Sequence, residues 1–241
     1  MAIEVFNRYE LKFIITDEQY NILRERLAEY MESDEYSKNG DFYTICNIYY
    51  DSPDNELIRR SLEGPVYKEK MRLRSYGTVP LDKKVFLEIK KKYQGLVNKR
   101  RTKIVLQDAY DYFETGELPE LQSYMNGQVL KEIDEMKNRM KLVPKLFLSY
   151  DRCAMFAKDD RDFRVTFDRN ITTRRYDLGL HYGIYGDKLL EEGVWIMEVK
   201  IDRAMPMWMT KILSDMHIYK NSYSKYGTEY TNFITKEKHN V

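Results

Sequence analysis

The sequence has little of the residue types from which many catalytic and metal centres are built. Its 241 residues include only two cysteines and three histidines. Cys46 and Cys153 lie far apart without metal-ligand spacing, so the sequence predicts two reduced thiols of a cytosolic protein and no redox chemistry. His181, His217 and His239 are dispersed along the chain, so we expect surface or core positions for them.

Long apolar runs and common catalytic motifs are also missing. The longest unbroken apolar run is Cys153 to Ala157, far short of the ~20 residues of a membrane-spanning helix. The N-terminus carries no apolar secretory segment, so we expect a cytoplasmic protein. No GxxxxGK[ST], GxGxxG, HExxH or GxSxG motif is present, which argues against P-loop and dinucleotide-binding enzymes, zinc proteases and α/β-hydrolases.

Positive charge is concentrated in one segment of an otherwise balanced chain. The 40 Lys and Arg residues nearly cancel the 39 Asp and Glu residues, for a formal net charge of +1. Between Lys68 and Lys103, however, thirteen Lys and Arg residues face only three acids, Glu69, Asp82 and Glu88. This asymmetry favours an anionic ligand held by one region, with nucleic acid as an alternative partner.

Hydrophobic periodicity predicts an α+β fold in a single domain, 1–241, because no Pro-, Gly- or Ser-rich linker interrupts the chain. Period-two alternation predicts about eight strands: Val5–Ile15, Thr44–Tyr50, Tyr67–Tyr76, Lys84–Lys92, Asn98–Leu106, Lys145–Arg152, Phe163–Asp168 and Val194–Ile201. Helical spacing predicts helices at Asp17–Met31 (with a capping box of Thr16 and Gln19), from Pro53, and near Asp108–Thr115, Pro119–Met140 and Pro206–His217. We expect a closed antiparallel β-barrel with the helices packed outside.

Within the predicted strands, charged side chains share one face because residues two apart point the same way. The rows are Arg8, Glu10 and Lys12; Lys68, Lys70, Arg72 and Arg74; Glu88 and Lys90; Lys99, Arg101 and Lys103; Arg164 and Asp168; and Glu198 and Lys200. A wet outer sheet face would explain any single row. Six rows rich in Arg and Lys repel one another unless a polyanion or a metal compensates, so we expect them to line the bore. Guanidinium and ammonium groups suit phosphate, and Glu10, Glu88 and Glu198 are carboxylates that a divalent cation could use beside phosphate oxygens.

Nine short motifs, in this order and spacing, resemble the vacuolar transporter chaperone (VTC) domain, the polyphosphate polymerase branch of the triphosphate tunnel metalloenzymes (CYTH-like superfamily). They are Arg8-Tyr9-Glu10-Leu11-Lys12, Ile48-Tyr49-Tyr50-Asp51, Lys70-x-Arg72-x-Arg74-x-Tyr76-Gly77, Glu88-x-Lys90, Asn98-Lys99-Arg100-Arg101, Tyr150-Asp151-Arg152, Arg164-x-Thr166-x-Asp168, Glu198-x-Lys200 and Ser224-Lys225-Tyr226. The resemblance extends from about Val5 to Tyr230.

The resemblance implies a tunnel-shaped barrel that binds ATP, triphosphate or polyphosphate with Mn²⁺ or Mg²⁺ and transfers the ATP γ-phosphoryl group onto a polyphosphate chain, with release of ADP. Catalytic roles then fall to Lys12, Arg72, Arg74, Lys90, Arg152, Arg164 and Tyr150. Phosphate binding is expected of Lys99, Lys200, Ser224 and Lys225, to which the charged rows add Arg8, Lys70 and Arg101. Glu198 matches the metal-binding carboxylate, and the rows add Glu10 and Glu88.

Two other functions stay open, and the first of them uses almost the same residues as the polymerase. An inorganic triphosphatase or polyphosphatase would let water replace the chain end as acceptor, and a non-catalytic module would bind polyphosphate for a separately encoded membrane partner. Relatives that hydrolyse thiamine triphosphate or cyclise ATP begin with Glu-x-Glu-x-Lys, whereas this sequence has Arg8 at the first position, which points away from those activities. Nucleic acid is disfavoured, since a bore is too narrow for a duplex and the strands lack interleaved aromatic platforms.

Overall fold

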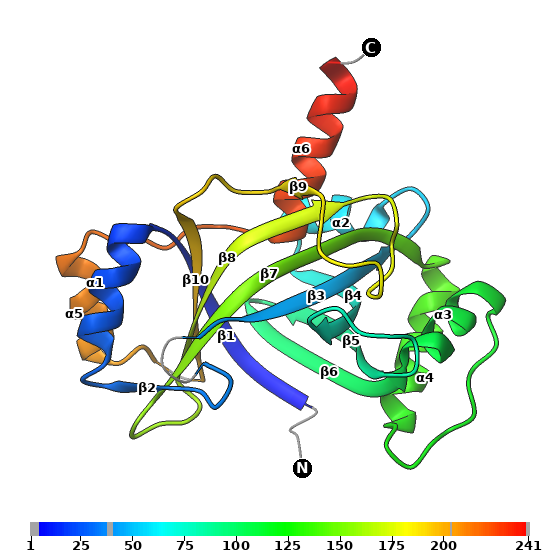
Figure 1. Ribbon diagram of the computed structural model, residues 1–241, viewed down its shortest axis with the longest axis horizontal. Coiled ribbons are helices and arrows are strands. Elements are labelled where there is room, and N and C mark those ends of the chain that lie inside the picture. The colour runs from blue at the N-terminus through cyan, green and yellow to red at the C-terminus, as the bar shows by residue number, and fades with distance from the viewer. Residues whose placement is uncertain (1–4, 38–40, 203, 240–241) are drawn as a thin grey trace.

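The computed structural model describes residues 5–37, 41–202 and 204–239, with side chains throughout except at 5–8 and 239. Within these ranges it contains ten strands and six helices, and all ten strands belong to one antiparallel sheet (Figure 1). The predicted α+β class is therefore confirmed. Cys46 and Cys153 are both buried and free.

Eight long strands form most of the sheet, and all eight were predicted. They are β1 (Val5–Thr16), β3 (Tyr43–Asp51), β4 (Tyr67–Tyr76), β5 (Lys84–Tyr93), β6 (Leu96–Val105), β7 (Val143–Ala157), β8 (Arg164–Arg174) and β10 (Val194–Ile201). Two short strands, β2 (Met31–Ser33) and β9 (Asp187–Lys188), were not predicted because two or three residues are too few to show a period.

The order of the strands brings distant parts of the sequence together. It is β2-β7-β3-β4-β5-β6-β1-β10-β8-β9, and β7 pairs in addition with β8 from Phe147/Arg174 to Phe156/Arg164. The sheet therefore curls until strands near its two ends meet. The tight β5–β6 hairpin has two loop residues, Gln94 and Gly95, both at positive φ (46° and 90°), which matches the twist of the flanking strands.

Five of the six helices within the described residues overlap the five predicted ranges, and their bounds differ from the predictions by up to eight residues. They are α1 (Asp17–Leu27), α2 (Glu56–Leu62), α3 (Leu106–Thr115), α4 (Gly127–Met140), α5 (Met207–Asp215) and α6 (Lys225–His239). The capping box of Thr16 and Gln19 is present, but the chain leaves the helix before Met31, which belongs to β2. The expected start of α4 at Pro119 is wrong because Asn126 caps the helix, and α6 was not predicted. No helix within the described residues is both long and apolar enough to cross a membrane.

The apolar face of the sheet points toward four of the helices. Met71, Leu73 and Leu87 are fully buried in a cluster with residues of α3 and α4. A second cluster joins β1, β8 and β10 to α1 and α5. In Figure 1, α1 and α5 lie at the left of the sheet, and α3 and α4 lie at the right. The charged residues alternate with these apolar ones and so face the inside of the curled sheet.

Helices α2 and α6 depart from the prediction that all helices pack outside. Ile58 of α2 and Tyr226 of α6 pack against Tyr49 of β3 and Leu148 of β7, whose side chains belong to the inner face. The first turns of α6 thus fill one end of the interior, while the rest of the helix projects away from the sheet (Figure 1). A short helix and a C-terminal helix therefore complete the enclosed space.

Candidate functional site

The curled sheet and the start of α6 enclose a cavity of about 870 Å³. Most of the sequence-predicted site residues line it. They are Glu10, Lys12, Lys70, Arg72, Arg74, Lys90, Lys99, Arg101, Tyr150, Arg152, Arg164, Glu198, Lys200, Ser224 and Lys225. The structure therefore brings together residues that are spread over more than two hundred positions of the sequence.

Two predicted site residues stand apart from this set. The backbone of Arg8 lies in β1 opposite Val97, but its side chain is outside the described residues. Glu88 lies beneath the cavity wall, with only 1% of the residue exposed. The structure does not bring it together with the other two predicted metal ligands on the wall.

Glu88 is the buried countercharge for three cations. Its carboxylate accepts hydrogen bonds from Arg72 Nε at 2.8 Å and Lys99 Nζ at 3.1 Å, and Arg74 Nε lies 3.8 Å away. Burial acts to raise its pKa, but Arg74, Lys99 and Arg72 outweigh burial and hold the pKa well below its usual range. This arrangement favours a structural role for Glu88 over a metal-binding one.

Along β4, the cations that line the cavity change from lysine to arginine, whereas on other strands Lys99 and Lys200 lie close to the arginines. On the inner face of β4 the order is Lys68, Lys70, Arg72, Arg74 and Tyr76, because residues two apart share a face. We define the lysine half, beside α6, as Lys12, Lys68, Lys70, Lys90 and Lys92, and the arginine half as Arg72, Arg74, Arg101, Arg152 and Arg164. Lys68 belongs to a charged row that was expected to line the bore, although it was given no role. Lys92 was in none of the rows, but its register places it opposite Lys68.

Like charges face one another directly across the strands. Lys90 lies between Lys70 of β4 and Lys99 of β6, and such pairs destabilise a sheet. Burial, followed by the charges of Lys12 and Lys90, lowers the pKa of Lys70 to about 7. Burial likewise lowers the pKa of Lys99 to about 7, against the opposing effect of Glu88. A bound polyanion would relieve this repulsion.

Two carboxylates lie among the lysines where β1 pairs with β10. Glu10 lies opposite Lys200 and Lys12 opposite Glu198 in the register, so the four charges alternate. Glu10 binds Lys90 at 2.6 Å, and Glu198 binds Lys200 at 3.1 Å. Burial acts to raise the pKa of Glu198, but Lys200 and Lys12 hold it well below its usual range. Burial also lowers the pKa of Lys200 to about 7, although Glu198 opposes that shift.

These two carboxylates could take part in binding a divalent cation. Burial and the charge of Glu198 both act to raise the pKa of Glu10, which shows that the two anions interact, although Lys90 and Lys200 lower it overall. Among the described residues, no group of three or more Asp, Glu, His or Cys side chains could hold a metal. Mg²⁺ commonly takes one or two carboxylates together with water and substrate phosphates. The donor set therefore fits a cation that binds together with a phosphate ligand.

Asp168 organises the wall between Arg152 and α6. It is fully buried, accepts two hydrogen bonds from Arg152 at 2.6 and 2.8 Å, and accepts one from Lys225 at 2.6 Å. Burial opposes ionisation, but Arg152 and Lys225 lower the pKa of Asp168 to about 2. The sequence motif contained Asp168 but gave it no role; the alternation with Arg164 was the signal that it faces the interior.

Tyr150 lies between the arginine half and the start of α6. Its hydroxyl accepts a hydrogen bond from Arg74 at 3.1 Å, and the Lys225 ammonium lies 4.6 Å from the centre of its ring. Arg74 also donates to Asn47 at 2.9 Å, so its guanidinium is fixed in orientation. These contacts hold Tyr150 and Arg74 as one rigid part of the wall.

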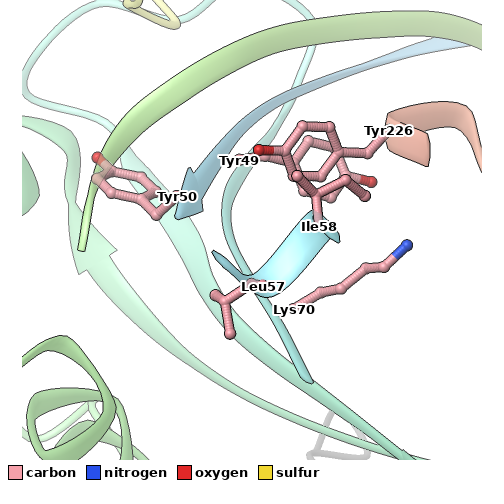
Figure 2. A pocket seen from close by; sticks show the side chains of 6 residues that line it. All are labelled: Tyr49, Tyr50, Leu57, Ile58, Lys70 and Tyr226. Atoms are coloured by element: carbon pink, nitrogen blue, oxygen red, sulfur yellow. The ribbon is translucent and has the colours of Figure 1, made fainter. Parts of the chain in front are cut away.

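Helix α6 is attached to the cavity wall through a small apolar junction, shown in Figure 2. The rings of Tyr49 and Tyr226 pack with centroids 5.0 Å apart, and the Tyr226 hydroxyl donates to Asp51 at 3.0 Å. Asp51 in turn accepts from the backbone amides of Leu57 and Ile58 in α2. Lys70, at the edge of the junction, donates to Ser224 at 2.9 Å. Tyr226 thus connects α6 to both β3 and α2.

Several lining residues were missed by sequence reasoning. They are Tyr43, Tyr49, Tyr76, Lys220, Asn221, Ser222, Tyr223, Thr228, Thr231 and Asn232. Residues from 220 to 223 lie in the loop before α6, where no periodicity indicates a direction. His181 and His217 do not line the cavity, and the side chain of His239 is outside the described residues.

Comparison with known proteins places this geometry in a family. No curated protein matches the chain in sequence. A candidate adenylate cyclase from Bacillus halodurans shares the fold, with a TM-score of 0.55 and 13% identity over 92% of this chain and 96% of that chain. A candidate adenylyl cyclase from Hippeastrum, described as having a dominant triphosphatase activity, has a TM-score of 0.54 and 14% identity over 95% of this chain and 96% of that chain. The VTC domain matches residues 7–234, so the chain belongs to the VTC domain family.

Proposed function

We propose that this domain is a metal-dependent polyphosphate polymerase that transfers the γ-phosphoryl group of ATP to the end of a polyphosphate chain and releases ADP. The observation that carries the proposal is that cations continue along the cavity beyond the arginine half. On β4 alone, every second residue is a cation that lines the cavity, and this row is about 20 Å long. It consists of Lys68, Lys70, Arg72 and Arg74. A row of this length suits a chain longer than one triphosphate.

The pairing of β7 with β8 supports a closed tunnel for this chain. Each of the eight long strands then has a hydrogen-bonded neighbour on both sides. Because the cations line the inside of this arrangement, a polyphosphate would be surrounded by donors rather than bound on an open face. The same enclosure disfavours nucleic acid as the partner.

The residues on the cavity wall match what phosphoryl transfer requires. The reaction is catalysed mainly by positioning and by stabilising charge on the transferred group, with no protein nucleophile needed. Arg72, Arg74 and Arg152 present planar donors, and each is held by an acceptor in the wall: Glu88, Asn47 and Asp168 respectively. We assign to them the phosphates around the scissile bond.

Glu198, with Glu10 beside it, would hold the divalent cation. Bound Mn²⁺ or Mg²⁺ would neutralise charge on the phosphate oxygens. Lys200 and Lys12, which pair with Glu198 at 3.1 and 4.0 Å, could turn toward phosphate when the carboxylate binds the cation. Release of these lysines from Glu198 would strengthen the grip on the substrate.

A triphosphatase is the second candidate, favoured by the activity described for the structural neighbour from Hippeastrum. Incubation with ATP and Mn²⁺, followed by gel analysis of chain length and an assay of free phosphate, separates the two. Long chains without free phosphate support the polymerase, and free phosphate alone supports the triphosphatase. Neither product would favour a polyphosphate-binding module that serves a membrane partner.

Two adjacent lysines of β5 provide a matched control for this experiment. Lys90 lines the cavity, whereas Lys91 lies on the other face and pairs with Glu132 of α4 at 3.8 Å. Lys90→Ala should lower product formation by about tenfold or more, and Lys91→Ala should leave it near wild type. Equal loss in both variants would mean that the activity does not depend on the cavity.

A further inference from the structure

Aromatic side chains gather at the end of the cavity that lies away from α6. Tyr43 begins β3 and Tyr76 ends β4, and both line the cavity. Their rings lie 6.0 Å apart, and Tyr36 packs against both at 5.9 and 6.4 Å. Phe86 of β5 contacts Tyr76 edge to face at 6.1 Å. We call Tyr36, Tyr43, Tyr76 and Phe86 the aromatic mouth.

Two of the four rings of the aromatic mouth are well exposed, and those of Tyr43 and Phe86 are half-buried. Tyr76 is 51% exposed and Tyr36 is 65% exposed, and a cluster of exposed aromatic rings is typical of a binding surface. Gly77 follows Tyr76 at a φ of 67°, and its amide donates to Thr44 at 2.8 Å. This turn fixes Tyr76 at the rim of the cavity.

Cations of the arginine half border the same rings. The Arg101 guanidinium lies 4.4 Å from the centre of the Phe86 ring. Arg164 donates to the Tyr43 hydroxyl at 3.3 Å and to Asp34 at 3.2 Å. Tyr76 is two residues beyond Arg74 on β4, so their Cα atoms are separated by about 7 Å along the strand. A ligand whose phosphate binds Arg74 could therefore place its next group on the aromatic mouth.

We propose that the aromatic mouth stacks the base of a nucleoside triphosphate whose phosphates lie in the arginine half. This inference rests on the proposed function and adds the end at which the nucleotide enters. Every nucleobase has a π-face that can stack on an aromatic side chain, so stacking of this kind depends little on the identity of the base. We therefore expect ATP and GTP to bind with similar affinity. The growing chain would then extend from the arginine half into the lysine half, toward α6.

Binding of a non-hydrolysable ATP analogue and of tripolyphosphate, measured with EDTA to prevent turnover, tests the proposal. Tyr76→Ala should weaken the ATP analogue by about tenfold and leave tripolyphosphate within about twofold, because only the nucleotide has a base to stack. Tyr76→Phe keeps the ring and should bind both ligands as wild type does. Tyr93→Ala is the matched control, since Tyr93 is similarly exposed at 56% but ends β5 on the opposite face.

The outcomes separate this inference from the proposed function. If the ATP analogue binds wild type and Tyr76→Ala equally well, the stacking site is wrong and the polymerase proposal stands. An equal loss for both ligands would mean that Tyr76 shapes the phosphate site, which also overturns the stacking site. If tripolyphosphate binds wild type and the ATP analogue does not, ATP is not the donor and both proposals fail.

Discussion

The lysine half and the arginine half of the cavity hold positive charge in different ways. In the lysine half, Lys12 donates to the Tyr223 carbonyl, Lys68 to the Ser61 carbonyl and Lys70 to the Ser224 hydroxyl, all neutral acceptors. In the arginine half, Arg72 and Arg152 bind the buried carboxylates Glu88 and Asp168. Lys68 and Lys70 are thus held by neutral groups, although Lys90 of the same half pairs with Glu10 at 2.6 Å. Arg72 and Arg152 are instead fixed by a buried countercharge.

This difference teaches how one cavity could both grip and move a polyanion. Guanidinium groups stay charged and present a rigid fork, while an ammonium group is a mobile point charge whose pKa shifts readily on burial. In the proposed reaction, the arginine half would fix the reacting phosphates and the lysine half would let the chain advance. Each prediction below tests one side of this comparison.

The largest effect is expected when a buried countercharge is removed from the arginine half. Asp168→Asn should lower the free energy of unfolding by about 3–5 kcal/mol at pH 7, because Arg152 and Lys225 lose their buried partner. Since the folded-state pKa of Asp168 is lowered to about 2, its contribution is present above about pH 4 and is lost as pH falls toward 2. Urea denaturation measures the change.

Two variants serve as controls for that measurement. Asp187→Asn removes an exposed ion pair with Lys236 at 3.7 Å and should cost less than about 1 kcal/mol. Glu10→Gln removes the partner of Lys90 in the lysine half, where Lys90 keeps access to water, and should cost less than Asp168→Asn. Equal destabilisation by Glu10→Gln and Asp168→Asn would show that the two halves do not differ.

Removal of the proposed metal ligand should have the next largest effect. Glu198→Gln keeps the shape of the side chain but removes its charge, so metal-dependent turnover should fall by about a thousandfold. Tripolyphosphate binding should be retained or tightened, since one anion leaves an anion-binding cavity. Turnover against Mn²⁺ concentration, together with tripolyphosphate affinity, measures both properties.

Glu132→Gln is the matched control for Glu198→Gln. Glu132 of α4 also pairs with cations, Lys91 and Arg100, but these lie on the outer face of the sheet. The control should keep wild-type turnover and wild-type metal dependence. If Glu198→Gln behaved in the same way, Glu198 would only neutralise Lys200 and Lys12, and the metal assignment would be wrong.

Exchange of the two cation types tests the comparison most directly. Arg74→Lys should lower kcat by about a hundredfold, because a lysine cannot bind both Asn47 and Tyr150 and still present a rigid donor to phosphate. Lys70→Arg should change kcat by less than about threefold, since the lysine half needs charge more than fixed geometry. Similar losses of kcat in both variants would show that the arginine half and the lysine half do not differ in how they act on the chain.

The strands and most of the cavity wall could be predicted from the sequence because both follow from period-two alternation. On β4 the apolar side chains of Met71 and Leu73 point to the buried outer face of the sheet. The alternating side chains of Lys70, Arg72 and Arg74 must then point to the inner face, which the sequence shows without the tertiary structure. The depth of Glu88 could not be predicted in this way. Alternation gives its face, but the long side chains that cover it come from other strands.

Helix α6 was missed for a different reason. Tyr226, Tyr230 and Phe233 recur at helical spacing, so the helix itself could have been predicted. Its position could not, because the contacts of Tyr226 with Tyr49 and Asp51 join residues about 175 positions apart. Loop residues such as Lys220 likewise reach the cavity only through the tertiary fold.

The smallest expected effect concerns the protonation of the lysines. Burial, with the neighbouring cations, lowers the pKa of Lys70 to about 7, and a bound polyanion should raise it again. Binding then takes up protons at alkaline pH, so tripolyphosphate affinity should fall by an amount on the order of tenfold between pH 7 and 8.5.

Arginine keeps its charge over this range, so Lys70→Arg is the control. Because the titration of tripolyphosphate itself is the same for both proteins, the ratio of wild-type to Lys70→Arg affinity isolates the lysine, and this ratio should fall as pH rises. A ratio that is constant from pH 6 to 9 would show that Lys70 stays protonated in the free protein, and that the lysine half is no easier to discharge than the arginine half.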